Sequence, residues 1–279
     1  MELRADLHVH TDYNPETRFW HGDKPKNIAR GIVDSKLDIY AITEHNHRGN
    51  KVGPRFFQVQ ERVAELLQGT AREALGLLGV ELSGVFEGKK YHVGYIFEGD
   101  YSAQTLPYIP DTGFNFRELE DYRAAYPGIA ILNHPTIREY KGRKTPDQIR
   151  QGLGITSEFL RSGLVNGVEI LNGSILNNDL PDDITKSVID LFRAAVGDGH
   201  RLAAIGASDA HVGADNRAED NMVGQVVTEF TGENKRDIFR CIREQRTRAK
   251  PQRPDIRRSV SSILRGYKHR KQWDSYIAI

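Results

Sequence analysis

The stretch ADLHVHT at residues 5–11 places two histidines, His8 and His10, two positions apart in an apolar run. Side chains alternate faces along a β-strand, so residues i and i+2 point the same way. Both imidazoles are therefore expected on one side of a strand, and neutral imidazole is the commonest metal ligand. The run LAAIGASDAH (202–211) repeats the spacing with Asp209 and His211.

Residues of metal-ligand type also occur in most of the other apolar runs. They are Glu44 and His45 in LDIYAITEH (37–45), Glu81 in LGLLGVELSG (75–84), His134 in GIAILNHP (128–135), and Glu169 with Asn172 in GVEILNG (167–173). KYHVGYIF (90–97) differs, because His92 stands near its start rather than its end. A lone histidine in an apolar segment is usually structural. The repeated pattern favours a metal site, because buried charges are paired or bind metal.

The types of these residues limit the metal. Imidazole and carboxylate ligands without thiolate suit Zn, Mn or Fe. The candidates outnumber the three or four protein ligands of a catalytic zinc site, so they suffice for two or three divalent ions with a bridging carboxylate. Such sites usually serve hydrolysis, because the ions acidify a bound water and hold the attacking and leaving oxygens.

The elements that must position these residues follow from the seven apolar runs, which are typical of strands covered on both faces. Helical patterns follow Pro25 and cover 54–75, 114–126, 145–162, 182–198 and 233–245. Strands alternating with helices predict a parallel sheet. Seven strands favour a closed or nearly closed α/β barrel, although an open doubly wound sheet fits the same periodicity. In such barrels the active site lies at the C-terminal ends of the strands.

The composition is that of a globular protein, with 38% hydrophobic and 28% charged residues in a chain of 279. A single cysteine, Cys241, excludes an internal disulfide and a cysteine-based zinc cluster. The chain has no apolar run long enough to span a membrane and no signal-type N-terminus. We therefore expect a cytoplasmic protein with no membrane contact.

The charge is unevenly distributed. Residues 246–271 contain ten Lys and Arg residues and one acidic residue, Asp255, whereas the whole chain has 39 basic and 38 acidic residues. The remaining chain is therefore acidic, which favours cations, while a basic tail can meet nucleic acid or lie solvated. We expect a barrel over residues 1–248 and a basic C-terminal extension over 249–279.

Taken in order, DLHVHT, ITEHN, GVELSG, HVGYIF, LNHP, GVEILNG and ASDAH resemble the motifs of the PHP (polymerase and histidinol phosphatase) family, over residues 6–211. The resemblance implies a distorted (β/α)7, TIM-barrel-like fold with a trinuclear metal site. It implies that one ion is held by His8, His10, Glu81 and Asp209. It further implies a second ion held by Glu81, His92 and His134, and a third held by His45 and His211.

The sequence leaves undecided which residue is the remaining ligand of the third ion. Relatives carry an acid or histidine shortly after the HxH motif, and this chain reads HTDYNPETRFWHGD there. Glu16 is the first choice, followed by His21 and then Asp12. The chain also departs from the family at Glu44, where relatives usually carry Asp. Glu44 is one methylene longer and can still orient an imidazole.

The resemblance predicts metal-dependent phosphoester hydrolysis, in which a hydroxide that bridges two ions attacks phosphorus. Glu81, Asp209 and His211 are the expected catalytic residues. Candidate substrate contacts are Arg18, His47, Arg138, Lys141 and Arg143, because Arg and Lys can grip phosphate. An exposed basic loop is an equally good interpretation of residues 138–143.

The substrate is expected to be a phosphomonoester, such as a nucleotide or sugar phosphate, or the end of a short nucleic acid. The alternatives are a 3′–5′ exonuclease or phosphodiesterase acting on short oligonucleotides, a histidinol phosphatase, and a barrel retained only for interaction. An amidohydrolase is a further alternative that rests on fold analogy alone, because similar barrels host that chemistry. The sequence does not decide the native metal or the oligomeric state.

Overall fold

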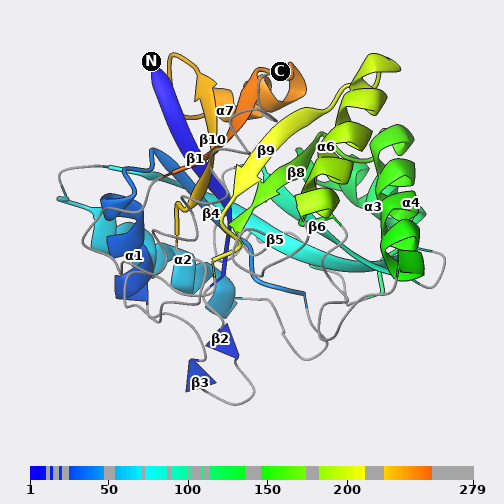
Figure 1. Ribbon diagram of the computed structural model, residues 1–279. Helices are drawn as coiled ribbons and strands as arrows, with labels where there is room; N and C mark the ends of the chain where they lie inside the picture. Colours follow the sequence, from blue (N-terminus) through cyan, green and yellow to red (C-terminus); the bar gives the residue numbers. More distant parts are fainter. Residues whose placement is uncertain are drawn as a thin grey trace.

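The fold is known from a computed structural model (Figure 1). The structure describes residues 1–10, 13–14, 19–20, 25–46, 54–70, 73–86, 89–99, 101, 109, 113–135, 146–173, 182–210 and 223–252. No helix among these residues is both long and apolar enough to cross a membrane.

A nine-stranded mixed sheet forms the centre of the molecule. Its strands are β1 (Glu2–Val9), β4 (Ile39–Ile42), β5 (Leu75–Phe86), β6 (Lys89–Phe97), β7 (Gly128–Leu132), β8 (Gly167–Asn172), β9 (Ala203–Ala207), β10 (Val226–Thr231) and β11 (Thr247–Pro251). Their order is β11-β10-β1-β4-β5-β6-β7-β8-β9, and β2 (Tyr13–Asn14) pairs separately with β3 (Phe19–Trp20). The seven runs expected to be strands correspond to β1 and β4–β9. β10 and β11 lie outside the seven runs from which strands were expected.

The strand directions differ from the expected parallel sheet. β1, β4 and β5 run parallel, as do β7, β8 and β9, but β6 is antiparallel to both β5 and β7. β10 and β11 are also antiparallel to their neighbours. The short connection between β5 and β6 explains the reversal, because a parallel pair would need a crossover of a dozen or more residues.

The ends of the sheet meet, so the sheet is nearly closed. Val9 forms a parallel bridge with Ala210, and the His10 amide donates to the Ala210 carbonyl over 2.8 Å. The Thr228 hydroxyl accepts from the Gly206 amide (3.1 Å) and donates to the Gly206 carbonyl (2.9 Å). Position 206 requires glycine, because a Cβ there would lie 2.4 Å from the Val227 carbonyl oxygen.

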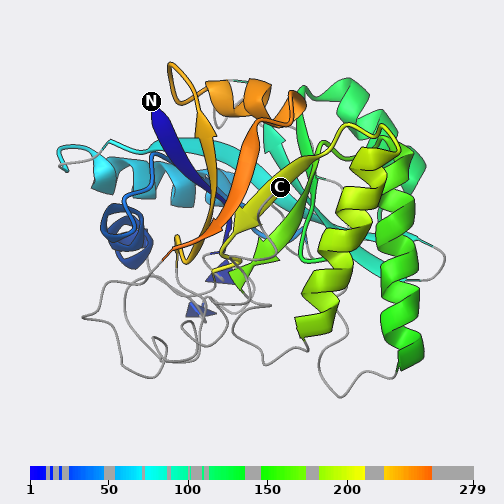
Figure 2. The same ribbon diagram turned by 45° about the horizontal axis from the view of Figure 1, so that its top comes forward.

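Helices cover the outside of this sheet in two groups (Figures 1 and 2). α1 (Pro25–Asp34) and α2 (Pro54–Leu67) pack together beside β4 and β5. α3 (Phe116–Ala125), α4 (Pro146–Ser162) and α6 (Asp182–Gly197) lie on the other side. Three of these helices begin at a proline, where the missing amide is not needed. A helix lies within each of the expected helical segments. The largest difference is at α2, which ends at Leu67, whereas the sequence predicted a helix up to residue 75.

The inside of the barrel is apolar at one end. Leu77, Ile96, Ile131 and Ile205 belong to one buried cluster contributed by strands around the sheet. The short helix α7 (Asp237–Arg243) adds Ile238, Phe239 and Ile242 to this cluster and so closes that end. Apolar burial stabilises the fold by roughly 25 cal/mol per Å².

The strand β11 crosses the boundary expected between residues 248 and 249. Ala249, Lys250 and Pro251 pair with Thr228, Val227 and Val226 of β10. The sheet therefore continues to Pro251. Residues 253–279, which include most of the basic segment, lie outside the described residues.

Candidate metal centre

The other end of the barrel interior is lined by histidines and carboxylates. β1 supplies His8, β5 supplies Glu81 and β6 supplies His92. The segments directly after β1, β4, β7 and β9 supply His10, His45, His134 and Asp209. All of them are buried except His45, whose side chain is 21% exposed. The seven described residues predicted as metal ligands are thus brought to one place.

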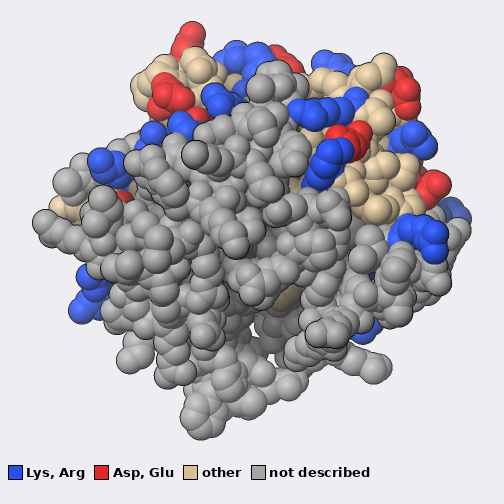
Figure 3. Space-filling model, viewed as in Figure 1, with Lys and Arg blue, Asp and Glu red and all other residues tan. Residues whose placement is uncertain are grey.

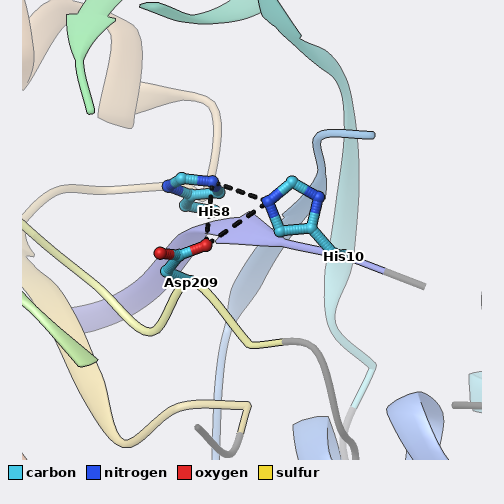
Figure 4. A group of neighbouring side chains, drawn as sticks. All are labelled: His8, His10 and Asp209. Carbon is cyan, nitrogen blue, oxygen red and sulfur yellow. Dashed lines mark hydrogen bonds and ion pairs between the residues drawn. The ribbon is translucent and has the colours of Figure 1, made fainter. Parts of the chain in front are cut away.

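The first candidate ligand group joins β1 to the end of β9 (Figure 4). The Nε2 atoms of His8 and His10 lie 2.9 Å apart, and each lies 3.4 Å from Asp209 Oδ1. Ligand atoms at about 2.1 Å from a zinc ion would be about 3.4 Å apart in a tetrahedron and about 3.0 Å apart at right angles. The spacing of these three atoms therefore fits a shared ion.

A second candidate group surrounds one oxygen of Glu81. Glu81 Oε1 lies 2.8 Å from His92 Nδ1 and 2.9 Å from His134 Nε2, and these two nitrogens are 3.2 Å apart. The reversed direction of β6 explains why His92 stands near the start of its strand. The start of an antiparallel strand lies at the same edge as the C-terminal ends of its parallel neighbours.

A third group lies at the other oxygen of the same carboxylate. Glu81 Oε2 is 2.5 Å from His45 Nδ1 and 3.5 Å from His10 Nε2. The rings of His10 and His45 stack with centroids 4.5 Å apart. Glu81 thus lies within 3.5 Å of all five described histidines of the site, counting His8 at 3.4 Å.

Electrostatics and burial act against each other here. Burial alone would raise the pKa of the Glu81 carboxyl, but His92, His45 and His8 hold that pKa well below its usual value. Burial lowers the pKa of His92 to about 3, in spite of Glu81. Burial would also lower the pKa of His8, but Glu169, Asp209 and Glu81 raise that pKa well above its usual range. Burial and the mutual contacts of these groups thus act in opposite directions, whereas metal binding requires a carboxylate at Glu81 and neutral imidazoles at the histidines.

The backbone is strained at two of the site residues. His134 has φ of +23° and Asp209 has φ of +50°, in the left-handed region that side chains disfavour. The other two non-glycine residues with positive φ in the described part of the chain are Lys36 and Gln245, which stand next to helix ends. Strain of this kind persists where surrounding structure imposes it, and it is often found at functional sites.

Buried side chains hold the ligands in place. Glu169, which the sequence pattern placed among the residues of metal-ligand type without a defined role, lies 2.7 Å from His8 Nδ1. Asn133 donates to Glu81 Oε1 over 3.1 Å, and its position directly before His134 was the available signal. Glu44 lies 3.8 Å from His10 Nδ1, which is an ion-pair separation rather than a hydrogen bond.

Asp6 joins β1 to two distant segments. Its carboxylate accepts from the amides of Ser208 (3.1 Å) and Gly224 (2.8 Å). Burial raises the pKa of Asp6 to about 6, although these amides lower it. Asp6 thus holds the segment that carries Asp209 against β1.

The remaining predicted residues lie outside the described residues. They are Glu16, its alternatives His21 and Asp12, the ligand and catalytic candidate His211, and the substrate candidates Arg18, His47, Arg138, Lys141 and Arg143. On the face shown in Figure 3, described Lys and Arg side chains are interspersed with Asp and Glu. The described part of that face therefore gives no broad basic patch that would indicate where a phosphate binds.

Comparison with known proteins supports the fold rather than an activity. No family model matches the chain. An uncharacterized protein of Methanocaldococcus jannaschii is 25% identical over 180 residues, which cover 60% of this chain and 90% of the relative. The crystal structure of PsfC from Pseudomonas syringae aligns with a TM-score of 0.55 and 17% identity, over 98% of each chain. The similarity to PsfC shows a shared fold.

Two other solved structures align less well. One is from Bifidobacterium adolescentis and is described provisionally as a metal-dependent phosphoesterase. It has a TM-score of 0.49 and 13% identity, over 85% of this chain and 96% of the other. An amidohydrolase from Chromobacterium violaceum, with bound sulfate and no metal, has a TM-score of 0.48 and 14% identity, over 91% and 99%. These similarities are too low to bear on activity.

Proposed function

We propose that this protein is a metal-dependent hydrolase that cleaves phosphoester bonds, with two or three divalent ions bound at the histidine-lined end of the barrel. The observation that carries the proposal is the position of Glu81. One of its oxygens contacts His92 and His134, and the other contacts His45 and His10. A buried carboxylate with imidazoles at both oxygens is suited to bridge neighbouring ions.

The residues divide into overlapping ligand groups. His8, His10 and Asp209 would hold one ion together with Glu81, and His92 with His134 would hold a second on Glu81 Oε1. His45 would contribute to a third, with His211 and Glu16 as further proposed ligands. Three ions held in this way would correspond to the trinuclear site that the resemblance to the PHP family implies, and imidazole and carboxylate ligands favour Zn, Mn or Fe.

The ions would supply two effects that suit phosphoester hydrolysis. They lower the pKa of a coordinated water to near neutrality and offset the charge that develops on phosphoryl oxygens. The protein's own residues would supply fixed ligand positions and exclude bulk water, because the ligands that the structure describes are buried except at His45. His45 marks the exposed side from which a substrate would enter.

The test is a paired hydrolysis assay with metal analysis. Protein reconstituted with Mn or Zn is given mononucleotides and a labelled short oligonucleotide, alongside the variants Glu81→Gln and Glu229→Gln. Glu229 is a matched control, because it is buried on β10 and pairs with Arg4 and Lys250 away from the site. We expect Glu81→Gln to lower kcat/KM on the order of 10³-fold or more, since a bound ion supplies several kcal/mol of transition-state stabilisation.

Each outcome has a definite meaning. Phosphate release from mononucleotides, with the oligonucleotide intact, assigns a phosphomonoesterase. Stepwise shortening of the oligonucleotide assigns an exonuclease and makes the basic segments its expected binding surface. Full activity of Glu81→Gln, or a wild-type protein that takes up neither metal, would overturn the proposal.

A further inference from the structure

Glu169 on β8 is a buried carboxylate outside the proposed ligand groups, and it contacts two of them. It is 1% exposed, and its Oε1 lies 2.7 Å from His8 Nδ1. Its Oε2 accepts from the backbone amide of His134 over 2.7 Å and from Asn172 Nδ2 over 2.8 Å. Three donors therefore converge on one carboxylate.

The contact with His8 sets which ring nitrogen faces the site. A carboxylate accepts but does not donate, so His8 Nδ1 carries the proton in this contact. When the imidazole is neutral, as it must be to bind a metal ion, the free lone pair is therefore on Nε2, the atom that lies 2.9 Å from His10 Nε2 and 3.4 Å from Asp209 Oδ1. A hydrogen bond of this kind orients a metal-binding imidazole and increases its basicity.

The contact with His134 acts on the backbone instead. The His134 amide points at Glu169 while the residue holds a φ of +23°. A hydrogen bond to an ionised acceptor is roughly twice as strong as a neutral one, so it can offset part of this strain. The same residue places its Nε2 2.9 Å from Glu81 Oε1.

We propose that Glu169 is a positioning residue that fixes the spacing between two metal positions, by holding His8 of one ligand group and His134 of the other. The inference rests on the proposed function insofar as ions occupy these groups. One residue is thereby expected to control both positions together, although no ligand of either is changed.

The variant Glu169→Gln isolates this role, because it keeps the size of the side chain. An amide has one acceptor oxygen and one donor group. If the oxygen faces the His134 amide, the NH₂ group faces His8 Nδ1. This nitrogen must then accept a hydrogen bond, so the His8 proton moves to Nε2. If the oxygen faces His8, the His134 amide loses its acceptor. In either orientation one ligand group is disturbed directly, and the shared Glu81 transmits the shift to the other.

The first measurement uses metal-free protein and ¹H–¹⁵N NMR of the His134 amide and the His8 imidazole. We expect both signals to change in Glu169→Gln and neither to change in Glu229→Gln, the matched buried control. Unchanged signals in Glu169→Gln would overturn the inference. This arm requires no bound metal, so it decides the role of Glu169 even if the wild-type protein takes up no zinc and the proposed function fails.

The second measurement is zinc stoichiometry and affinity by elemental analysis and chelator competition. We expect Glu169→Gln to weaken both positions on the order of 10–100-fold. Wild-type affinity at both positions, or loss confined to one, would overturn the inference. If Glu169→Gln fails to fold, Glu169→Asp tests the same point, because the shorter carboxylate cannot reach both His8 and His134 at their present distances.

Discussion

The two ends of the barrel interior are built from the same strands but differ in chemistry. On β5, Leu77 lies in the apolar cluster, and Glu81, four residues further along the same face, lies at the centre of the histidines. On β6 the order is reversed, with His92 before Ile96. An interval of four residues separates a region that stabilises the fold from one in which buried charge costs stability unless it is compensated.

The two ends are therefore expected to contribute differently to the stability of the protein. The apolar end is closed by α7 and needs no ligand to be satisfied. At the other end, the carboxylates and imidazoles contact one another, and a bound metal ion would be coordinated by the same oxygen and nitrogen atoms. We therefore expect stability to come mainly from the apolar end and its dependence on metal to come from the other.

Truncation of Phe239 on α7 should give the largest loss of stability. Phe239 is buried in the apolar cluster beside Ile238 and Ile242. Phe239→Ala should lower the free energy of unfolding by about 3–5 kcal/mol, through lost burial and a residual cavity. Urea unfolding measures this effect. The zinc content of the folded variant should equal that of the wild type, and a loss of zinc from folded protein would contradict the separation of the two ends.

Addition of metal should stabilise the protein through the polar end alone. At a free metal concentration 100 times the Kd, one occupied site raises the free energy of unfolding by about 2.7 kcal/mol. Urea unfolding with and without zinc should show this rise in the wild type and in Glu229→Gln. It should be absent in Glu81→Gln. An equal rise in Glu81→Gln would mean that zinc binds elsewhere.

Much of the barrel could be predicted, because its strands are continuous apolar runs whose polar residues stand at one end. The candidate ligands His8, His10, Glu81 and Asp209 follow from that local pattern. Strand direction leaves a weaker signal, so His92 was hard to place until β6 proved antiparallel. The position of His92 near the start of its run, rather than at the end, was the sign that this strand runs in the opposite direction.

Long-range support could not be predicted in the same way. Glu169 lies 161 residues from His8 in the sequence, and Asp6 lies 218 residues from Gly224. No local periodicity reports such pairs. β10 was missed although Val226, Val227 and Phe230 are buried, because the polar residues Thr228 and Glu229 interrupt the apolar run.

The contact between β9 and β10 at Gly206, where the barrel closes, lies near Asp209. Two glycine substitutions test whether this contact affects the metal site. A Cβ on Gly206 would lie 2.4 Å from the Val227 carbonyl, whereas one on Gly154 in α4 would meet nothing within 4 Å. Gly206→Ala should cost about 1–3 kcal/mol, because the backbones must move apart. Gly154→Ala should stabilise the helix by about 0.5–1 kcal/mol. Because Gly206 precedes Asp209 by three residues on the same segment, its substitution should also weaken zinc binding, measured by chelator competition. Unchanged zinc affinity in Gly206→Ala would mean that Asp6, rather than the contact between β9 and β10, fixes the position of Asp209.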